Sequence, residues 1–234
     1  MTLKLYSWAT PNGHKVHILL EELGVPYEMH AVDIFKGAQM APDFAAINPN
    51  RRIPALIDEE PGQTPLRVFE SGAIMLHLAE KFGRFLPADP AGRLETISWL
   101  MWQMAGLGPM LGQGQHFWTY AAEKHPYAIE RYTNEGMRLL GVMDDTLARR
   151  DYLAGDYGIA DMACFPWVRI HKLAHLSLDT FPHVQRWYGA IRNRSAVQRG
   201  LDLLRQHLTG VPNEKEAREI MFGATQYRRQ ETPT

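Results

Sequence analysis

Hydrophobic and polar positions in the first 86 residues alternate between the period of a strand and the period of a helix. Residues 3–7 alternate as in a short strand, and apolar residues at helical spacing follow until Gly24. The further elements predicted here are a strand at 27–32, a short helix at 42–47, a hairpin with strands at 54–58 and 66–69, and a helix that begins at Ser71. The order βαβαββα predicts a mixed sheet with helices packed on it.

A turn-rich segment at 83–92 ends this pattern, and the chain after it has apolar residues at helical spacing. The apolar stripes run through 94–104, 129–147, 184–191 and 197–208. From Pro212 the chain is mixed in charge, and we expect a loosely held extension there. The predicted organisation is an α/β domain at 1–86, a linker at 87–93, an all-helical domain at 94–211 and a C-terminal extension at 212–234.

Composition and charge narrow the possible partners. The 234 residues are 45% hydrophobic and 22% charged, which is typical of a globular chain and argues against a disordered one. Lys and Arg number 25 against 26 Asp and Glu, so no positive excess points to nucleic acid. We also expect no targeting segment and no membrane span, because apolar runs such as 162–168 are too short. The chain's one cysteine, Cys164, excludes an internal disulfide, and we expect a reduced, cytoplasmic protein.

The junction between the first strand and the first helix carries the first candidate site, with Thr10 and Asn12. Such a junction directs free backbone N–H groups and the positive end of the helix dipole towards a ligand, so a thiolate is stabilised there. The Thr10 hydroxyl would add a hydrogen bond to the ionised sulfur. Thr10 or Asn12 as an ordinary helix cap explains the same residues, and both interpretations stay open.

Three further segments have polar groups that suit a peptide-like ligand. A cis bond between Ile53 and Pro54 would leave the Ile53 backbone exposed to pair with an extended ligand. Glu70 and Ser71, at a second strand-to-helix turn, suit the ammonium and the carboxylate of an amino acid, although an N-cap also explains Ser71. Gln39 ends a loop with an amide side chain.

These segments together resemble the glutathione transferase family, and the similarity covers almost the whole chain. Ile53-Pro54 and Glu70-Ser71 resemble the family's glutathione-site elements, and GIAD at 158–161 resembles its buried helix-capping motif. The most similar class is the bacterial nu class, whose members are glutathione-dependent disulfide-bond reductases. The stretches that carry this resemblance are TPNGHK at 10–15, FESGAI at 69–74, WQ at 102–103 with GLGPMLGQ at 106–113, and PYAIERY at 126–132.

The resemblance implies a thioredoxin-like N-terminal domain, an all-helical C-terminal domain, a homodimer, and glutathione as the bound thiol without a metal. It assigns Thr10 as the hydroxyl donor to the glutathione sulfur and Asn12 as a second polar contact near that sulfur. The other implied contacts are Gln39 and the Ile53 backbone to the glutathione backbone, Glu70 and Ser71 to the γ-glutamyl end, and Arg131 to the ligand across the dimer interface. An exposed helix charge is the alternative for Arg131.

Two positions depart from the family's pattern. Arg52 stands where Lys or another polar residue is usual, and its guanidinium suits the glycyl carboxylate of glutathione. Gly158 replaces the usual Ser or Thr of the capping motif, but Asp161 can still receive backbone N–H groups.

The chemistry of the chain agrees with a thiol that comes from the ligand. In a thioredoxin-like fold a C-x-x-C pair would occupy 10–13, and this chain has no cysteine there. We therefore expect a disulfide-bond oxidoreductase that uses the thiolate of bound glutathione to reduce small disulfides. The same thiolate could conjugate small electrophiles or reduce peroxides. A glutathione-binding or regulatory protein without turnover is the alternative outside enzymes.

Other residues have rival interpretations. Tyr6 or Ser7 could replace Thr10 as the hydroxyl donor, although we favour packing of both in the sheet. Cys164 lies in an apolar run and is expected to be buried and inert. His171 and His175 are spaced like two metal ligands on a helix, with no third ligand evident. The aromatic residues that could line an electrophile pocket, or belong to the core, are Trp99, Trp102, His116, Phe117 and Trp118.

Overall fold

The computed structural model of the chain describes residues 1–208 and 214–226, which divide into two compact units. Unit 1 comprises Met1–Ala9, Pro26–Glu70 and Leu203–Thr234, and unit 2 comprises Thr10–Val25 and Ser71–Asp202. Much of the predicted extension at 212–234, namely 212–213 and 227–234, lies outside the described residues. No helix in the described part of the chain is long and apolar enough to cross a membrane.

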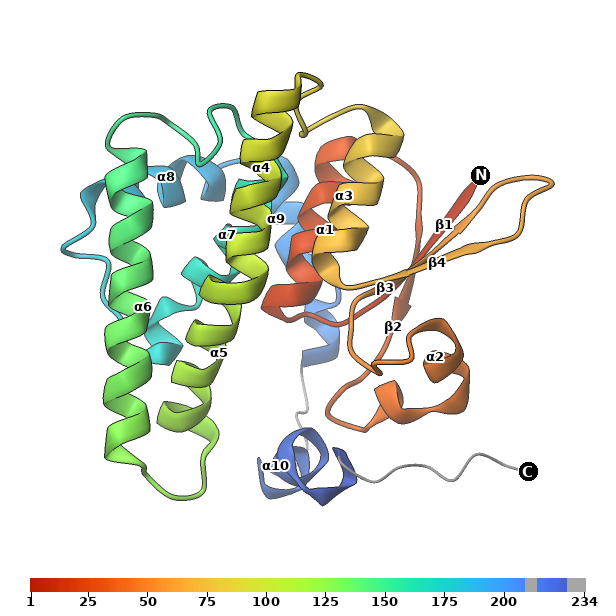
Figure 1. Cartoon of the computed structure of the whole chain (residues 1–234). Coiled ribbons are helices and arrows are strands. Elements are labelled where there is room, and N and C mark those ends of the chain that lie inside the picture. Colours follow the sequence, from red (N-terminus) through yellow and green to blue (C-terminus); the bar gives the residue numbers. More distant parts are fainter. Residues whose placement is uncertain (209–213, 227–234) are drawn as a thin grey trace. The chain divides into compact units, whose positions relative to one another are not determined.

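Unit 1 is built on a four-stranded mixed sheet with the strand order β2-β1-β3-β4 (Figure 1). The strands are β1 (Thr2–Ser7), β2 (Glu28–Ala31), β3 (Ala55–Glu59) and β4 (Leu66–Phe69). β1 pairs parallel with β2 and antiparallel with β3, so that Leu5 lies opposite Met29 on one side and Leu56 on the other. Buried and half-buried positions alternate along β1, as its sequence pattern predicts.

Short helical segments complete unit 1: η1 (Ala38–Met40), α2 (Pro42–Ile47), η5 (Arg205–Leu208), α10 (Glu214–Phe222) and η6 (Ala224–Gln226). An apolar cluster of Val32, Phe44 and Ala55 joins the residue after β2 to α2 and β3, and Tyr6 and Ile53 pack against it. This cluster fixes the loop before β3, because Ile53 contacts it with its side chain. The extension that we expected to be loosely held is helical over Glu214–Phe222.

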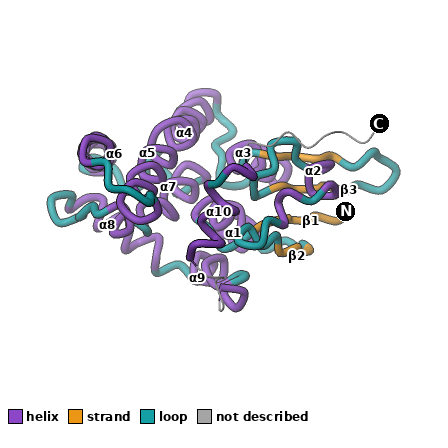
Figure 2. Tube along the Cα trace, turned by 90° about the horizontal axis from the view of Figure 1, so that it is seen from below, coloured by secondary structure: helices purple, strands orange, loops and turns teal. Residues whose placement is uncertain are grey.

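Unit 2 consists of helices and their connections: α1 (Pro11–Leu23), α3 (Ser71–Phe82), α4 (Pro90–Trp102), η2 (Gln103–Leu107), α5 (Gly108–Gln115), η3 (His116–Tyr120), α6 (Pro126–Leu147), α7 (Ile159–Arg169), η4 (His171–Ala174), α8 (Pro182–Arg192) and α9 (Ser195–Asp202). α7 lies in the middle, where it contacts α1, α3, α4, α5 and α8 (Figure 2). Nine of its eleven residues are buried. The position of every helix around it therefore depends on α7.

The order of elements confirms the predicted βαβαββα pattern and the helical run that follows it. The predicted linker at 87–93 is too long, because α4 begins at Pro90. The Asp89 carboxylate explains this early start, since it accepts a hydrogen bond from the Gly92 N–H at 2.8 Å while Pro90 occupies the first helical position. An Asp followed directly by Pro is here a helix start.

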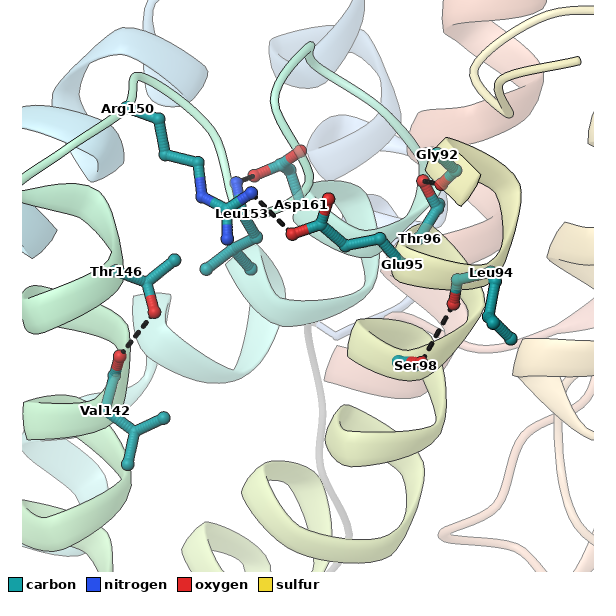
Figure 3. Close-up of polar contacts among 10 residues, drawn as sticks. All are labelled: Gly92, Leu94, Glu95, Thr96, Ser98, Val142, Thr146, Arg150, Leu153 and Asp161. Atoms are coloured by element: carbon teal, nitrogen blue, oxygen red, sulfur yellow. Dashed lines mark hydrogen bonds and ion pairs between the residues drawn. The ribbon is translucent and has the colours of Figure 1, made fainter. Parts of the chain in front are cut away.

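A buried carboxylate fixes the first turn of α7. Asp161 accepts hydrogen bonds from the backbone N–H groups of Leu153 (3.0 Å) and Gly158 (3.1 Å) and from Nε1 of Trp187 (2.8 Å). Figure 3 shows the bond to Leu153 beside the ion pair between Arg150 and Glu95. Burial raises the pKa of Asp161 to about 6, although these donors favour its ionised form. The capping motif expected at 158–161 is therefore formed.

The backbone around Gly158 explains why this chain has no Ser or Thr at the helix cap. A Cβ atom at Gly158 would lie 2.8 Å from the carbonyl oxygen of Phe85. That oxygen also accepts a hydrogen bond from the Ile159 N–H at 3.0 Å, so it cannot move away without cost. The close approach of two backbone segments thus requires glycine here.

Replacing Asp161 by Ala should lower the free energy of unfolding by about 3–5 kcal/mol, because three buried donors lose their acceptor. Urea unfolding followed by circular dichroism measures this change. Asp145→Ala, on the exposed face of α6, is the matched control and should change stability by less than about 0.5 kcal/mol. Equal losses in the two variants would contradict a stabilising role for Asp161.

Candidate functional site

The predicted site residues are divided between the two units. Unit 1 holds Gln39, Arg52, Ile53 and Glu70, and unit 2 holds Thr10, Asn12, Ser71 and Arg131. The chain itself joins the two groups, because Ala9 is bonded to Thr10 and Glu70 to Ser71.

In unit 1, the buried side chain of Asn48 organises the loop before β3. Its Nδ2 donates to the Arg52 carbonyl oxygen at 2.6 Å, and its Oδ1 accepts from the Asn50 N–H at 2.8 Å. The Ile53–Pro54 bond is cis, and Ile53 lies outside the strand ladder, which begins at Ala55. Asn48 is not among the residues predicted from the sequence, although the Asn-Pro dipeptide at 48–49 is a turn signal.

Glu70 has an unusual backbone conformation directly before α3. Its φ of 70° lies in the left-handed region, which costs energy for a residue with a Cβ and is more frequent at functional sites. The carboxylate is exposed and accepts a hydrogen bond of 3.4 Å from Nδ2 of Asn50. Its position and charge suit an ammonium group of a ligand.

Gln39 is buried, and its amide is only partly satisfied by the protein. Nε2 donates to the Ile34 carbonyl oxygen at 3.3 Å. Among the residues that the structure describes, no donor reaches Oε1 of Gln39. A buried oxygen without a donor is costly, so this atom suits an N–H group of a peptide-like ligand.

The described part of the C-terminal extension contacts the two loops that carry Gln39 and Arg52. Nη1 of Arg52 donates to Oε1 of Gln226 at 2.7 Å, which uses one of the five donors of the guanidinium. A Cβ at Gly37 would lie 3.7 Å from the side chain of Ile220 in α10. Gln226 is thus a partner of Arg52 that the sequence did not indicate.

In unit 2, Thr10 is the N-cap of α1, as the interpretation of Thr10 as an ordinary helix cap predicts. Its backbone is extended, and Oγ1 accepts a hydrogen bond from the Gly13 N–H at 3.3 Å. A hydroxyl that accepts one bond still has its own proton to donate. The cap and the donor role are therefore compatible, because each uses a different part of the same hydroxyl.

Asn12, in the first turn of α1, is tied to the central helix of unit 2. Its Oδ1 accepts a hydrogen bond of 3.1 Å from Nε1 of Trp167 in α7. No local pattern in the sequence indicates this contact, because 155 residues separate Trp167 from Asn12.

Ser71 begins α3 with a buried ammonium group beside it. Lys15 is only 2% exposed. Its Nζ donates to Oγ of Ser71 at 3.3 Å and lies 3.6 Å from Sδ of Met104. Positive charge at a helix N-terminus favours an anion there. Lys15 thus strengthens the predicted carboxylate site, and only its place in the TPNGHK motif could have indicated it.

Arg131 is an exposed charge on α6. Its side chain is 56% exposed, and Nη1 lies 3.6 Å from Oε2 of Glu135. Glu135 is bound more closely by Arg138, at 2.9 and 2.6 Å, and the hydrogen bond to Arg138 is the main cause of its lowered pKa. Arg131 is consequently held loosely by its own helix.

The rival hydroxyl donors pack in the sheet. The Tyr6 ring stacks on His30 with 4.5 Å between centroids and also contacts Phe44. Ser7 is fully buried. These positions favour packing over a role at the α1 N-terminus.

The two histidines that suggested metal ligands do not share an α-helical face. His171 belongs to the 3-10 turn η4, and Nδ1 donates to the Val168 carbonyl oxygen at 2.8 Å. His175 has a φ of 54° and stacks on Trp118. Within 1–208 and 214–226, no three His, Cys, Asp or Glu residues gather as metal ligands.

The aromatic candidates pack within unit 2. Trp99 and Trp102 form an edge-to-face pair with 5.1 Å between centroids. Phe117 stacks on Tyr132, and Nε1 of Trp118 donates to Oγ1 of Thr133 at 3.2 Å. All of these residues, His116 included, are half-buried, and none of them belongs to the buried core.

Two family models match the chain. The model described as "Glutathione S-transferase, N-terminal domain" matches residues 1–80, and "Glutathione S-transferase, C-terminal domain" matches residues 117–195. The chain is 46% identical over 202 residues to "Disulfide-bond oxidoreductase YfcG" of Escherichia coli, which covers 85% of this chain and 94% of that protein. It is 47% identical over 213 residues to "Disulfide-bond oxidoreductase YghU" of the same organism, covering 85% and 73%.

Solved structures are similar as well. A glutathione transferase of Burkholderia graminis with two glutathione molecules bound per subunit has a TM-score of 0.82 and 46% identity, covering 86% of this chain and 88% of that one. One of Pseudomonas putida with one glutathione disulfide bound per subunit has a TM-score of 0.82 and 45% identity, covering 86% and 91%. These similarities confirm the expected fold.

We expect Cys164 of the native protein to react very slowly with 5,5′-dithiobis(2-nitrobenzoate). The thiol is buried, and burial together with the nearby Asp161 carboxylate raises its pKa well above the usual value. In guanidinium chloride the single thiol should react at once, and Cys164→Ser gives the background. Rapid reaction of the native thiol would show that Cys164 is accessible.

Proposed function

Because the chain belongs to the glutathione S-transferase family, we propose that it is a glutathione-dependent disulfide-bond oxidoreductase that reduces small disulfides. The observation that carries this proposal is the N-terminus of α1, where Thr10 and Gly13 stand in place of a C-x-x-C cysteine pair and Asn12 lies between them. A thiolate is stabilised at such a position, and the chain has no thiol of its own there. Similarity to YfcG and YghU, which are named disulfide-bond oxidoreductases, supports the same activity.

Glutathione is the thiol substrate, and each predicted site residue suits one of its parts. Thr10 and Asn12 act near the sulfur, and the Ile53 backbone and Oε1 of Gln39 bind the peptide backbone. The buried, unsatisfied oxygen of Gln39 supports its share of this assignment. The two ends of the ligand are bound by charged or polar side chains, which are Glu70 and Ser71 at the γ-glutamyl end and Arg52 at the glycyl carboxylate. The Lys15 ammonium beside Ser71 favours a carboxylate there.

The reaction needs no protein thiol. The glutathione thiolate attacks one sulfur of the substrate disulfide, the S–S bond breaks, one substrate thiolate leaves, and a mixed disulfide forms. A second glutathione thiolate then attacks the glutathione sulfur of this mixed disulfide and releases the second substrate thiolate. Glutathione disulfide is the oxidised product. The similar structures that hold two glutathione molecules or one glutathione disulfide support this sequence.

The protein belongs to the nu class and acts in the cytoplasm as a homodimer, in which Arg131 reaches the glutathione of the partner. The exposure of Arg131 and its weak tie to Glu135 support this role. Large apolar side chains on α4 and α6 are also exposed: Leu94 by 66%, Met101 by 47% and Tyr127 by 80%. A second copy that covers them would remove this apolar surface from water.

Steady-state turnover of glutathione with 2-hydroxyethyl disulfide and with 1-chloro-2,4-dinitrobenzene, on one protein preparation, tests the activity. We expect fast disulfide reduction and weak conjugation. The reverse result would make the protein a conjugating transferase. Binding of glutathione without either reaction would favour a regulatory protein, and both results would contradict the proposal.

Thr10→Ala should bind glutathione nearly as well as the wild type but raise the barrier to disulfide reduction by about 1–3 kcal/mol, because the thiolate loses a hydrogen bond. Measurement of kcat/KM beside the glutathione Kd separates the two effects. Thr10→Ser keeps the hydroxyl and the cap, so it should retain most of the activity. Unchanged turnover in Thr10→Ala would shift the donor role to Asn12, Tyr6 or Ser7.

A further inference from the structure

We propose that Trp167 is a positioning residue that fixes the side-chain amide of Asn12, so that its NH2 group faces the sulfur of bound glutathione. This inference rests on the proposed function. It concerns a residue that would not touch the ligand, but that decides how a ligand-binding side chain is oriented.

The contact between the two side chains allows one orientation of the amide. Nε1 of Trp167 lies 3.1 Å from Oδ1 of Asn12, and both residues belong to unit 2. An indole N–H can donate but cannot accept a hydrogen bond. The opposite orientation of the amide would place the NH2 group against the indole N–H, donor against donor. Trp167 therefore selects the orientation in which Oδ1 of Asn12 faces α7.

The orientation of Asn12 matters because an amide has opposite ends. With Oδ1 bound to Trp167, the NH2 group is left to donate, and a donor stabilises a thiolate. In the reversed orientation the partial negative charge of Oδ1 would face the sulfur and disfavour its ionised form. The same side chain can thus help or hinder the reaction, and the indole N–H determines which.

Two glycines of α5 leave room for the Trp167 ring. A Cβ at Gly108 would lie 2.6 Å from Nε2 of Gln103 and 3.1 Å from Nε1 of Trp167, whereas a Cβ at Gly112 would meet the indole first, at 3.1 Å from Cη2. These residues are one helical turn apart, so together they form a flat face against which the indole lies. Glycine within a helix costs about 0.5–1 kcal/mol relative to alanine, and this short helix has three, at 108, 112 and 114. For Gly112 the indole of Trp167 supplies the packing reason. Part of the GLGPMLGQ stretch is thereby explained: its glycine at 112 makes room for the indole that binds Asn12.

Trp167→Phe tests the inference because it removes the N–H and keeps an aromatic ring. We expect the pKa of the bound glutathione thiol to rise, as measured by the ultraviolet absorption of the thiolate across a pH series. The value of kcat/KM for 2-hydroxyethyl disulfide should fall about 5- to 30-fold, as for the loss of one hydrogen bond to a charged group. The glutathione Kd should change less than about 3-fold, because Trp167 does not bind the ligand.

A double-mutant cycle separates positioning from a general effect of the substitution. If Trp167 acts through Asn12, Trp167→Phe should have little further effect on the thiol pKa in an Asn12→Ala background. A full effect in that background would overturn the inference.

The glycines provide a second test with a matched control in the same helix. Gly112→Ala should press the added methyl group against the indole and raise the thiol pKa of bound glutathione. Gly114→Ala should leave that pKa unchanged, because its Cβ would meet Ala174 at an ordinary distance of 3.5 Å. An equal response of the two variants would contradict a specific role for the indole contact.

The contact can also be tested without glutathione, even if Trp167→Phe folds poorly. The indole N–H resonance of Trp167 should shift in Asn12→Ala, and no shift would overturn the inference. If the wild type fails to ionise bound glutathione, the proposed function fails and the inference fails with it. If the wild type ionises glutathione and Trp167→Phe does so equally well, only the role of Trp167 is wrong.

Discussion

The buried carboxylate of Asp161 is the interaction on which the arrangement of unit 2 depends. It binds the backbone N–H groups of Gly158, at the start of α7, and of Leu153, in the loop before it, as well as the Trp187 indole of α8, and so fixes α7 from its first turn. Helix α7 in turn contacts five other helices of the unit and holds Trp167 six residues beyond Asp161. The placement of the Asn12 amide therefore depends on a carboxylate that has no chemical role in the reaction. Burial raises the pKa of this carboxyl to about 6, because the charged form loses solvation in the interior.

Helix α1, which carries Thr10 and Asn12, is held along its length by the helical residues of unit 2. Burial lowers the pKa of His14 to about 4 and that of His17 to about 3, so both are neutral at physiological pH and pack as uncharged rings. Near the other end of the helix, Glu22 binds Arg194 through two hydrogen bonds of 2.6 and 3.0 Å. A helix fixed by packing in its middle and by an ion pair near its end presents its first turn in one position. This rigidity is what a site that relies on hydrogen-bond direction requires.

Local patterns in the sequence predicted most of the fold, because strands and helices follow the period of buried positions over a few residues. The start of α4 was misplaced since Asp89 was taken as part of a linker, although its cap is also a local feature. What the sequence could not predict are contacts between distant residues. The bond of Asn12 to Trp167 spans 155 residues, that of Arg52 to Gln226 spans 174, and that of Lys15 to Ser71 spans 56. The candidate residues were chosen by resemblance, whereas the groups that orient them appear only when the helices are packed.

A site that supplies hydroxyl and amide donors to a thiolate has a chemical advantage in disulfide exchange. The attacking thiol needs enough thiolate to react, but its nucleophilicity falls as its pKa falls, so the best pKa lies near the ambient pH. In the proposed function, neutral donors such as Thr10 and the Asn12 amide would stabilise the sulfur anion less than a full positive charge would. They can therefore lower the thiol pKa towards neutrality and leave a nucleophilic sulfur. In such a site the strength of each donor depends on its direction, which is why an indole N–H behind Asn12 would matter for the rate.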